Sequence, residues 1–413
     1  MDITDIISKL NNHEIKFHEL EEIVGVEAAP EVRRAYLKSH LGKEFKSISN
    51  FEFDLEEIHN KNCENVIGGI SVPLGIAGPL RVNGENSNGE FFIPIATTEG
   101  ALIASINRGC KVISLAGGAT SIVEVKGISR APIIKVQNIS EAKKLKDWIR
   151  DNKEKLKDIA EATSSHIKLL DIKTYSNGKY VWVRINFDTE DAMGMNMAVF
   201  ATQEIVKYLE SNIKNIKIIA LSGNVCVDKK PAAINIIEGR GKIVETEVSI
   251  PKALVEKYLK TSAEEMVEIN KSKIWLGGHM SGSLGFNAHV ANMIAGIFLA
   301  TGQDIAHVVD ASTSSINMSI EGDNLDVNLR IPALNIGTVG GGTQLSTQKE
   351  CQDILMYDLT KQNNQEFNRT KRMAEIIGAA VLAGELSLHA AFSSNSFVCA
   401  HGNLGRKKCK ITV

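Results

Sequence analysis

The chain has 413 residues, 43% of them hydrophobic and 23% charged, which is the composition of a globular protein with a large buried core. Its 47 basic and 49 acidic residues give a formal charge of −2, so the overall charge favours neither nucleic acid nor an anionic membrane as a partner. The length predicts two or three domains.

The cysteines and the N-terminal residues predict the compartment. The six cysteines form no CxxC pair and have no metal-ligand spacing, so we expect reduced thiols and no bound metal ion. The first residues lack the basic start and apolar run of a signal peptide, and we expect no stretch that spans a membrane. We therefore expect a cytoplasmic protein.

The first third of the chain predicts helices and then short strands. Residues 1–45 combine helical periodicity with dense charge, which predicts a small helical N-terminal segment. Residues 46–131 are rich in glycine and proline and predict strands and hairpins, with a turn signal at Asn83 and Gly84. A helix is expected from Ala101 onwards.

The remaining segments predict an inserted small domain, followed by a mainly helical continuation of the large domain. Residues 132–221 have a βαββαβ pattern, which predicts a ferredoxin-like small domain inserted into a large one. Residues 222–395 resume the large domain, and their apolar run at 285–304 predicts a long central helix. Residues 396–413 are basic and interrupted by glycine, which predicts a mobile C-terminal flap. The predicted fold class is α+β.

One tract stands out for its charges. Within SGNVCVDKKPAAINIIEGRGK, at 222–242, Asp228, Lys229 and Lys230 are consecutive and have apolar neighbours. Two adjacent ammonium groups repel each other, which favours a role in binding an anionic ligand or a developing oxyanion. The alternative is a solvated turn in which Asp228 is an N-cap and Pro231 lies near the first helical position.

Two acids lie where predicted elements end. Glu99 follows a strand and begins a helix, with Thr97 or Thr98 as the expected N-cap, and an acid there is often structural because it favours the helix dipole. Asp304 closes the apolar run at a helix end where the dipole disfavours an anion, which predicts a raised pKa and a proton-handling role. The alternative for Asp304 is a solvated acid.

Two loops and one histidine are further candidates for ligand binding or catalysis. DAMGMNM at 191–197 is either core filler or a surface that fits a flat heterocycle. GTVGGGTQ at 337–344 follows a predicted strand, and its glycines allow backbone amides to approach a phosphate, although it matches neither GxGxxG nor the Walker pattern. His401 lies at the root of the basic tail, where a mobile segment can cover a ligand or simply be disordered.

Together these tracts resemble the class I 3-hydroxy-3-methylglutaryl-coenzyme A reductase family over most of residues 60–405. DAMGMNM and DKKPAAIN are the most specific of them, and all occur in the family's order. The other matching tracts are ENVIGGISVPLGIAGPL (64–80), ATTEGALIASINRGCK (96–111), GFNAHVANMIAGIFLATGQD (285–304), GTVGGGT (337–343) and ELSLHAAF (385–392).

The resemblance implies a reaction and its catalytic residues. The family reduces a thioester to an alcohol with two hydrides from a nicotinamide and releases coenzyme A. Lys229 then stabilises the oxyanion, His401 protonates the thiolate, Glu99 donates a proton to the second alkoxide, and Asp304 is linked to Lys229.

The resemblance also implies binding residues and a homo-oligomer whose active site lies between two subunits. The substrate-binding residues implied are Glu64, Asn65, Arg130, Ser222, Asp228, Lys230 and Asn292. The cofactor-binding residues implied are Ser164, Ser165, His166, Asp191, Met193, Gly194, Met195, Asn196, Gly340, Gly341, Gly342 and Thr343. Arg130 suits a carboxylate because its planar fork binds both oxygens.

Three positions depart from the family pattern. Gly69 stands where many animal relatives have an aromatic residue, which weakens the expectation of adenine stacking there. Ser165 replaces the arginine of the phosphate-binding loop, leaving His166 and Lys168 nearby as cations. NADPH is therefore favoured, with NADH left open. Lys407 replaces a regulatory serine, and the animal membrane anchor is not expected.

Other functions remain open from the sequence. A coenzyme A-dependent acyl transferase or lyase would use the same thioester pocket without oxidising a nicotinamide. A noncatalytic coenzyme A-binding homologue is disfavoured because all four expected catalytic residues are present. The reverse reaction, oxidation of mevalonate coupled to NAD, is a further alternative.

Overall fold

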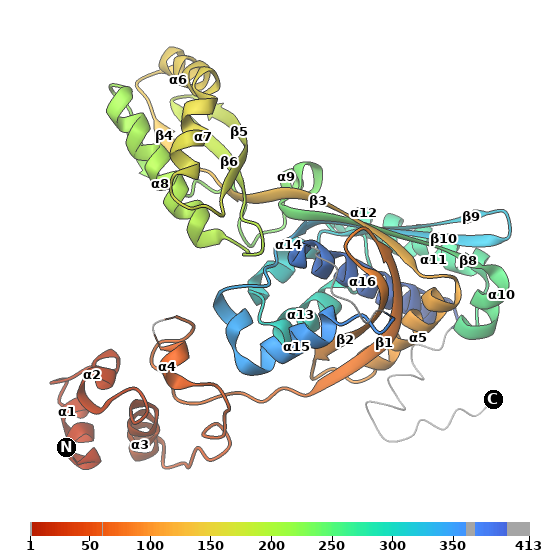
Figure 1. Cartoon of the computed structure of the whole chain (residues 1–413), viewed down its shortest axis with the longest axis horizontal. Helices are drawn as coiled ribbons and strands as arrows, with labels where there is room; N and C mark the ends of the chain where they lie inside the picture. The colour runs from red at the N-terminus through yellow and green to blue at the C-terminus, as the bar shows by residue number, and fades with distance from the viewer. Residues whose placement is uncertain (1, 60, 361–367, 395–413) are drawn as a thin grey trace.

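The structure is a computed structural model and describes residues 2–59, 61–360 and 368–394 (Figure 1). Its N-terminal helices α1 (Ile3–Asn11), α2 (Leu20–Val24) and α3 (Ala29–Leu41) lie apart from the main body and bury a small apolar core of their own. A hydrogen bond of 2.8 Å from Arg34 to the carbonyl of Ile67 ties α3 to the extended segment that follows. These helices confirm the helical prediction for this part of the chain.

The described strands form one continuous ten-stranded sheet. In the large part, β3 (Ala119–Arg130), β8 (Gly241–Pro251), β10 (Asn324–Leu334) and β9 (Ser315–Glu321) are neighbours in that order and pair antiparallel. At its edge, β1 (Leu74–Gly84) runs parallel to β3 and pairs antiparallel with β2 (Asn88–Ala96).

The turn signal at Asn83 and Gly84 has a different role from the predicted one. Both residues belong to β1, and the turn follows them, closed by a 2.8 Å bond from the Gly84 amide to the Ser87 carbonyl. A Cβ at Gly84 would lie 2.2 Å from a carboxylate oxygen of Glu375. Glycine is needed here for the close approach of a buried acid, not for the turn.

The long central helix is α16 (Arg369–Ser393), which packs against β3, β8 and α5 (Leu102–Leu115) (Figure 1). The apolar run at 285–304 contains only the twelve-residue α13 (Val290–Thr301), which is a buried core helix but not the long one. The tract KRMAEIIGAAVLAGELSLHAAF at 371–392 does predict a helix, and α16 confirms it, although buried acids interrupt its apolar face. Glu385, for example, accepts the amide of His289 at 2.7 Å.

Within the described ranges, α16 is the one helix long and apolar enough to cross a membrane, contrary to the expectation that no stretch reaches that length. In this structure 83% of its apolar window is buried inside the fold. It therefore serves here as a core helix, since its apolar faces are covered by protein.

The small lobe follows the predicted element order. Its strands lie in the order β7-β4-β6-β5, pair antiparallel, and carry their helices on one face (Figure 1). The long strand β3 pairs with β8 in the large part and with β6 in the small lobe, so it runs through both. The elements are β4 (Ile133–Lys135), α6 (Ile139–Asp151), α7 (Lys153–Glu161), β5 (Lys168–Asn177), β6 (Tyr180–Asp188), α8 (Met195–Asn212) and β7 (Lys217–Ala220).

Short helical elements complete the described chain. The α-helices are α4 (Leu55–Ile58), α9 (Ala233–Glu238), α10 (Lys252–Leu254), α11 (Ala263–Ile269), α12 (Gly277–Ser281), α14 (Val308–Ala311) and α15 (Ser346–Met356). Three 3-10 turns span Phe17–Glu19, Ile305–His307 and Gly341–Gln344, and two π-helical turns span Val255–Leu259 and Asn270–Leu276.

Candidate active site

The loop that carries the lysine pair begins beside the end of β3. Ser222 forms a parallel bridge with Ala131, and the amide of Gly223 donates to the Ala131 carbonyl at 2.6 Å. Trp182 of the small lobe donates from its indole to the Gly223 carbonyl at 2.8 Å. Arg130, the last residue of β3, therefore lies close to Ser222.

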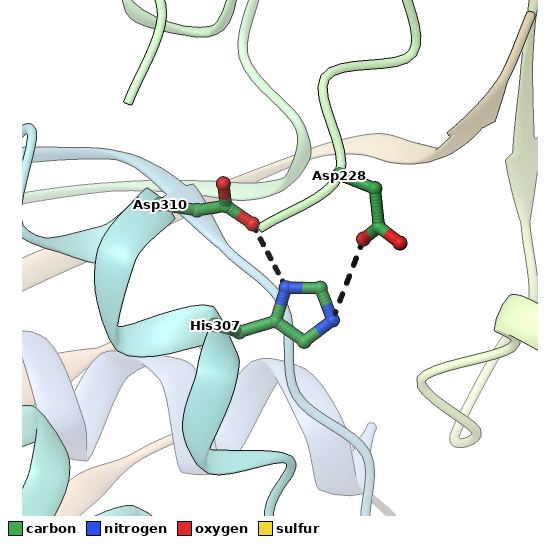
Figure 2. Close-up of side chains that lie close together, drawn as sticks. All are labelled: Asp228, His307 and Asp310. Carbon is green, nitrogen blue, oxygen red and sulfur yellow. Dashed lines mark hydrogen bonds and ion pairs between the residues drawn. The ribbon is translucent and has the colours of Figure 1, made fainter. Parts of the chain in front are cut away.

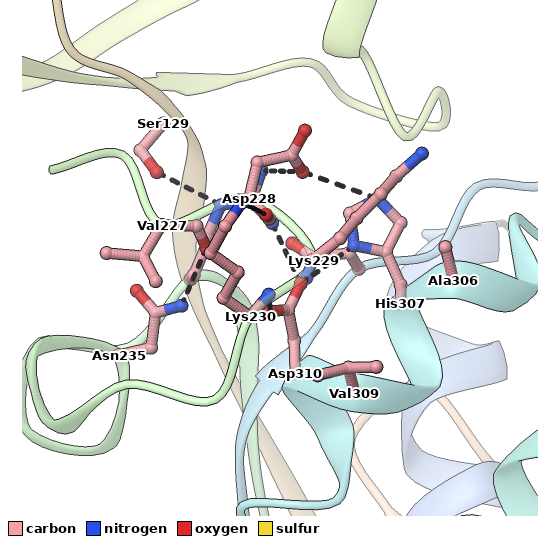
Figure 3. Close-up of polar contacts among 12 residues, drawn as sticks. Ser129, Val227, Asp228, Lys229, Lys230, Asn235, Ala306, His307, Val309 and Asp310 are labelled. Carbon is pink, nitrogen blue, oxygen red and sulfur yellow. Dashed lines mark hydrogen bonds and ion pairs between the residues drawn. The ribbon is translucent and has the colours of Figure 1, made fainter. Parts of the chain in front are cut away.

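The same loop is held in an unfavourable backbone conformation. Asn224, Val227 and Lys229 have φ values of 65°, 47° and 56°, which β-branched and long side chains rarely adopt. Buried partners hold it: Ser129 donates to the Cys226 carbonyl at 2.8 Å, and Asn235 donates to the Val227 carbonyl at 3.1 Å (Figure 3). Strain of this kind persists only where the surroundings fix it, and it is common at functional sites.

The alternative of a solvated turn is right in part, since Asp228 and Lys229 lie in a turn and Lys229, Lys230 and Pro231 are exposed, but its helix-capping role for Asp228 is wrong. Helix α9 begins at Ala233 with Ala232 as its N-cap, so Asp228 caps no helix and Pro231 is not in its first turn. The Asp228 carboxylate instead accepts from Arg240 at 3.0 Å and lies 3.7 Å from the Arg130 guanidinium. The tertiary partners, not the local sequence, determine what Asp228 does.

Lys229 and Asp304 form an ion pair, with Nζ 2.7 Å from Oδ2. Asp304 does not end α13, which stops at Thr301; it caps the next 3-10 turn by accepting the Ala306 amide at 3.1 Å. Burial raises the pKa of Asp304, but the hydrogen bond from Lys229 and the charges of His307 and Lys229 outweigh it, so the net shift is downward. The predicted raised pKa is therefore wrong.

Behind this pair lies a buried polar cluster that the sequence analysis missed (Figures 2 and 3). Asp310 is fully buried and accepts from Arg240 at 3.1 Å and from the Lys230 amide at 3.1 Å, and it lies 2.8 Å from Nδ1 of His307. Arg240 is fully buried as well. The available signal was the tract IAHVVDA, where a histidine and an acid three residues apart interrupt apolar residues.

By ligand type and spacing, Asp228, His307 and Asp310 could hold a metal ion (Figure 2). Both carboxylates, however, already bind the Arg240 guanidinium, at 3.0 Å and 3.1 Å. A second cation there would be repelled by that guanidinium, so the chemistry of this donor set favours an ion-pair network over a metal site.

The two loops proposed from the sequence to bind the cofactor lie side by side. Ala192 and Val339 form a parallel bridge, and the amide of Thr338 donates to the Asp191 carbonyl at 2.8 Å. Gln303, next to Asp304, exchanges two hydrogen bonds of 2.9 Å with the backbone of Gly337. Gln303, which sequence reasoning missed, therefore joins the cofactor loops to the ion pair.

The glycines of these loops have separate roles. Gly194 begins α8 with φ 85°, and a Cβ there would lie 2.2 Å from the Thr189 hydroxyl. Gly340 and Gly341 are exposed with φ 78° and 57°, and a Cβ would meet nothing within 4 Å. Their amides lie open to a ligand. Of the other residues, Gly342 packs on Gly302, Thr343 is buried, Met193 and Met195 pack on the small-lobe core, and Asn196 is exposed.

The segment expected to bind the 2′-phosphate, residues 164–168, has two cations that contact the carboxylate of Glu190. His166 lies 2.8 Å and Lys168 4.0 Å from the Glu190 carboxylate, and the hydrogen bond from His166 lowers the pKa of Glu190. Ser164 lies 3.9 Å from the sulfur of Met197, and Ser165 is exposed. Glu190, another residue missed from the sequence, thus holds both cations that remain for a 2′-phosphate.

Several residues predicted for the active site do not contact the Lys229–Asp304 ion pair in the described part of this chain. Glu99 is exposed, its amide donates to Thr97 at 3.0 Å, and α5 begins only at Leu102, so neither Thr97 nor Thr98 is the helix N-cap. In the described part of the chain, the Glu99 carboxylate and the Asn292 side chain have no polar partner. Glu64 and Asn65 are exposed near α3, and His401 lies outside the described residues.

Gly69 borders a cavity of about 750 Å³ between the 50–53 segment and the large lobe. A Cβ at Gly69 would lie 2.8 Å from Phe51 and 3.1 Å from Phe53, whose rings stack with centroids 4.4 Å apart. An aromatic side chain at position 69 has no room in this arrangement. The aromatic surface of the cavity comes from Phe51 and Phe53 instead.

Known proteins resemble the whole chain. The family model described as hydroxymethylglutaryl-coenzyme A reductase matches residues 29–406. A 3-hydroxy-3-methylglutaryl-coenzyme A reductase from Methanocaldococcus jannaschii is 46% identical over 407 residues, covering 97% of this chain and 99% of that protein. One from Pyrococcus abyssi is 43% identical over 411 residues, covering 98% and 100%.

Among solved structures, a class II 3-hydroxy-3-methylglutaryl-CoA reductase from Streptococcus pneumoniae bound to NADPH in open conformations has a TM-score of 0.64. It is 19% identical and covers 88% of this chain and 96% of that one, which shows the likeness of fold alone. Because the family model matches most of the chain and the archaeal relatives match nearly all of it, this chain belongs to the hydroxymethylglutaryl-coenzyme A reductase family.

Proposed function

We propose that the chain reduces 3-hydroxy-3-methylglutaryl-coenzyme A to mevalonate and coenzyme A, consuming two reduced nicotinamides. The observation that carries this proposal is the 2.7 Å ion pair of Lys229 and Asp304, which Gln303 connects to the two adjacent cofactor loops. In this proposal the carbonyl oxygen of a bound thioester lies near the Lys229 ammonium group, and its carbonyl carbon faces the nicotinamide.

In this proposal Lys229 stabilises the oxyanion that forms when the thioester carbonyl is reduced. Asp304 holds the ammonium group in place and keeps it charged by accepting its hydrogen bond. His401 protonates the departing thiolate, and Glu99 donates the proton that completes the alcohol.

The substrate carboxylate is proposed to bind Arg130, whose guanidinium is mostly buried and lies at the mouth of the lysine loop. Ser222, Asp228, Lys230 and Asn292 surround the same acyl group in this proposal. For the coenzyme A part, we propose Glu64 and Asn65 with the adjacent cavity.

The nicotinamide cofactor is proposed to be NADPH, held by residues 191–196 and 340–343 together with 164–166. The exposed amides of Gly340 and Gly341 fit a pyrophosphate, because backbone N–H groups without side chains can approach it closely. Bound there, the cofactor supplies hydride. His166 and Lys168 offer positive charge to a 2′-phosphate only by leaving Glu190, so NADH remains the second candidate.

We further propose a class I enzyme that works in the cytoplasm as a homo-oligomer. The identity of 46% to an archaeal relative, against 19% to a class II structure, supports the class. Glu99 has no polar partner in the described chain, which supports a site completed by a second copy. Residues 132–221 are proposed as the nicotinamide domain, residues 46–131 and 222–395 as the substrate domain, and 396–413 as the flap.

The test is to mix purified protein with 3-hydroxy-3-methylglutaryl-coenzyme A and either NADPH or NADH. The absorbance of the reduced nicotinamide and the released thiol are followed together. Two nicotinamides oxidised per thiol are expected from the proposed stoichiometry. Thiol release without oxidation would favour the transferase or lyase, and no change in either signal would favour a noncatalytic homologue. Incubating mevalonate, coenzyme A and oxidised cofactor measures the reverse direction.

A further inference from the structure

His307 lies in the centre of the buried cluster, and both of its ring nitrogens face carboxylates (Figure 2). Its side chain is fully buried, and Nδ1 lies 2.8 Å from Oδ2 of Asp310. Nε2 lies 3.8 Å from Asp304 and 3.9 Å from Asp228, and it has no hydrogen-bond partner. The ring therefore lies between Asp310 on one side and Asp304 and Asp228 on the other.

The contacts of Asp310 decide which nitrogen of His307 carries a proton. Asp310 accepts three further hydrogen bonds of 3.1 Å, from Arg240, Asn335 and the Lys230 amide. A carboxyl group with so many donors is ionised, and two lone pairs cannot face each other at 2.8 Å, so Nδ1 of His307 must be the donor.

The surroundings of Nε2 decide the charge of the ring. If Nε2 were unprotonated, its lone pair would face two carboxylate oxygens inside a buried site, where such repulsion is strongest. A proton on Nε2 converts both contacts into attractive ones.

We propose that His307 is an imidazolium that positions Asp304 for Lys229 and Asp228 for Arg240 during the reduction. The inference rests on the proposed function and adds a residue to it. His307 transfers no proton in this role, because 3.8 Å and 3.9 Å are ion-pair distances and not hydrogen bonds.

The charged groups around the His307 ring come from its own 3-10 turn, from α14, from the lysine loop and from the residue before β8. They are Asp304 at the start of its own 3-10 turn, Asp310 of α14, Asp228 and Lys229 of the loop, and Arg240 before β8. When His307 loses its proton, the orientation of Asp304 toward Lys229 is lost. The turnover rate should then fall as the pH rises, while nicotinamide binding is spared.

Two variants separate the two nitrogens of His307. His307→Asn keeps a donor near the position of Nδ1 but removes the charge, and His307→Gln places a neutral amide near the position of Nε2. We expect both to lower kcat roughly tenfold or more, since each loses a charge-assisted contact. The KM for the nicotinamide should stay within about twofold, because the cofactor loops contact Gln303 and not His307. His18→Gln, an exposed histidine of the N-terminal segment, is the control and should behave as the wild type.

The pH profile distinguishes positioning from a merely structural role. The wild-type kcat should fall as the pH rises above neutrality, and His307→Gln should lack that limb. A wild-type profile and kcat in His307→Gln would overturn the proposal. So would a loss that affects nicotinamide KM and thermal stability equally and leaves the shape of the profile unchanged.

A second measurement needs neither folding of a variant nor activity. Nitrogen NMR of the wild-type protein with ¹⁵N-labelled histidine should show His307 with both ring nitrogens protonated at neutral pH. A neutral ring would refute the inference. A wild-type protein that oxidises no nicotinamide would refute the proposed function, and the NMR result would still decide the state of His307.

Discussion

The charge clusters around Arg240 and around Glu190 lie near the residues proposed to bind the substrate and the cofactor, and they differ in burial. Arg240 and Asp310 are fully buried, whereas His166 and Glu190 are 68% and 41% exposed. Arg240 donates to Ser129, Asp228 and Asp310, whereas the Glu190 carboxylate in the described chain is paired with the exposed side chains of His166 and Lys168. The buried cluster is therefore expected to fix geometry and stability, and the exposed one to tune cofactor choice.

The largest effect should come from Arg240→Met, which leaves the carboxylates of Asp228 and Asp310 without their shared cation. Removing one partner of a buried ion pair costs about 3–5 kcal/mol of unfolding free energy. Urea unfolding measures it. The matched control is Arg150→Met in α6, where Arg150 is 69% exposed and pairs with Asp147 and Asp151, and where about 0–1 kcal/mol is expected. Equal losses of unfolding free energy in the two variants would contradict the expected difference between buried and exposed ion pairs.

Lys229→Ala should leave the fold intact and remove the cation at the oxyanion. A fall in kcat on the order of 10²–10³-fold is expected, because one stabilising donor contributes about that much. Both the thioester and free mevaldehyde should be affected, and single-turnover assays with each substrate measure this. Loss with the thioester alone would show that Lys229 acts only in the first reduction.

On the exposed side, Glu190→Gln should release His166 and Lys168 for a 2′-phosphate. The ratio of kcat/KM for NADPH to that for NADH should rise by roughly threefold to tenfold, the scale of a solvent-exposed charge contact. Ser165→Arg should act in the same direction. If neither substitution changes the ratio, the 2′-phosphate is held elsewhere.

The smallest effect concerns Asp304, whose folded pKa lies below its ordinary value of 3.8. A group with a depressed folded pKa stabilises the fold above its unfolded pKa and loses that contribution as the pH falls through the folded value. Asp304→Asn keeps an oxygen for the Ala306 amide. It should therefore be slightly less stable than the wild type at neutral pH, with the difference shrinking as the pH falls below 3.8 and vanishing below the lowered folded pKa. A difference that persists in acid would point to packing and not to the Lys229 ion pair.

Local patterns predicted much of the fold. The alternation of the small-lobe strands and the charge of the N-terminal helices depend on neighbouring residues, and both segments have the predicted elements. The prediction failed where distant residues decide the local structure. The acids of α16 are buried because Asn86, Ser87 and the start of α13 supply donors, which no periodicity reveals.

The site shows the same division. By itself, the sequence indicated the family and singled out the lysine pair and the 191–197 and 337–344 loops, because these tracts have particular residue types in consecutive positions. The resemblance already implied the link between Asp304 and Lys229, but only the tertiary structure decided that Gln303 bonds to Gly337 and that Arg240, His307 and Asp310 form one buried network. The reason is physical: desolvated charges are stable only with partners at hydrogen-bond distance, and Asp310 finds its partners Arg240 and Lys230 70 and 80 residues away along the chain.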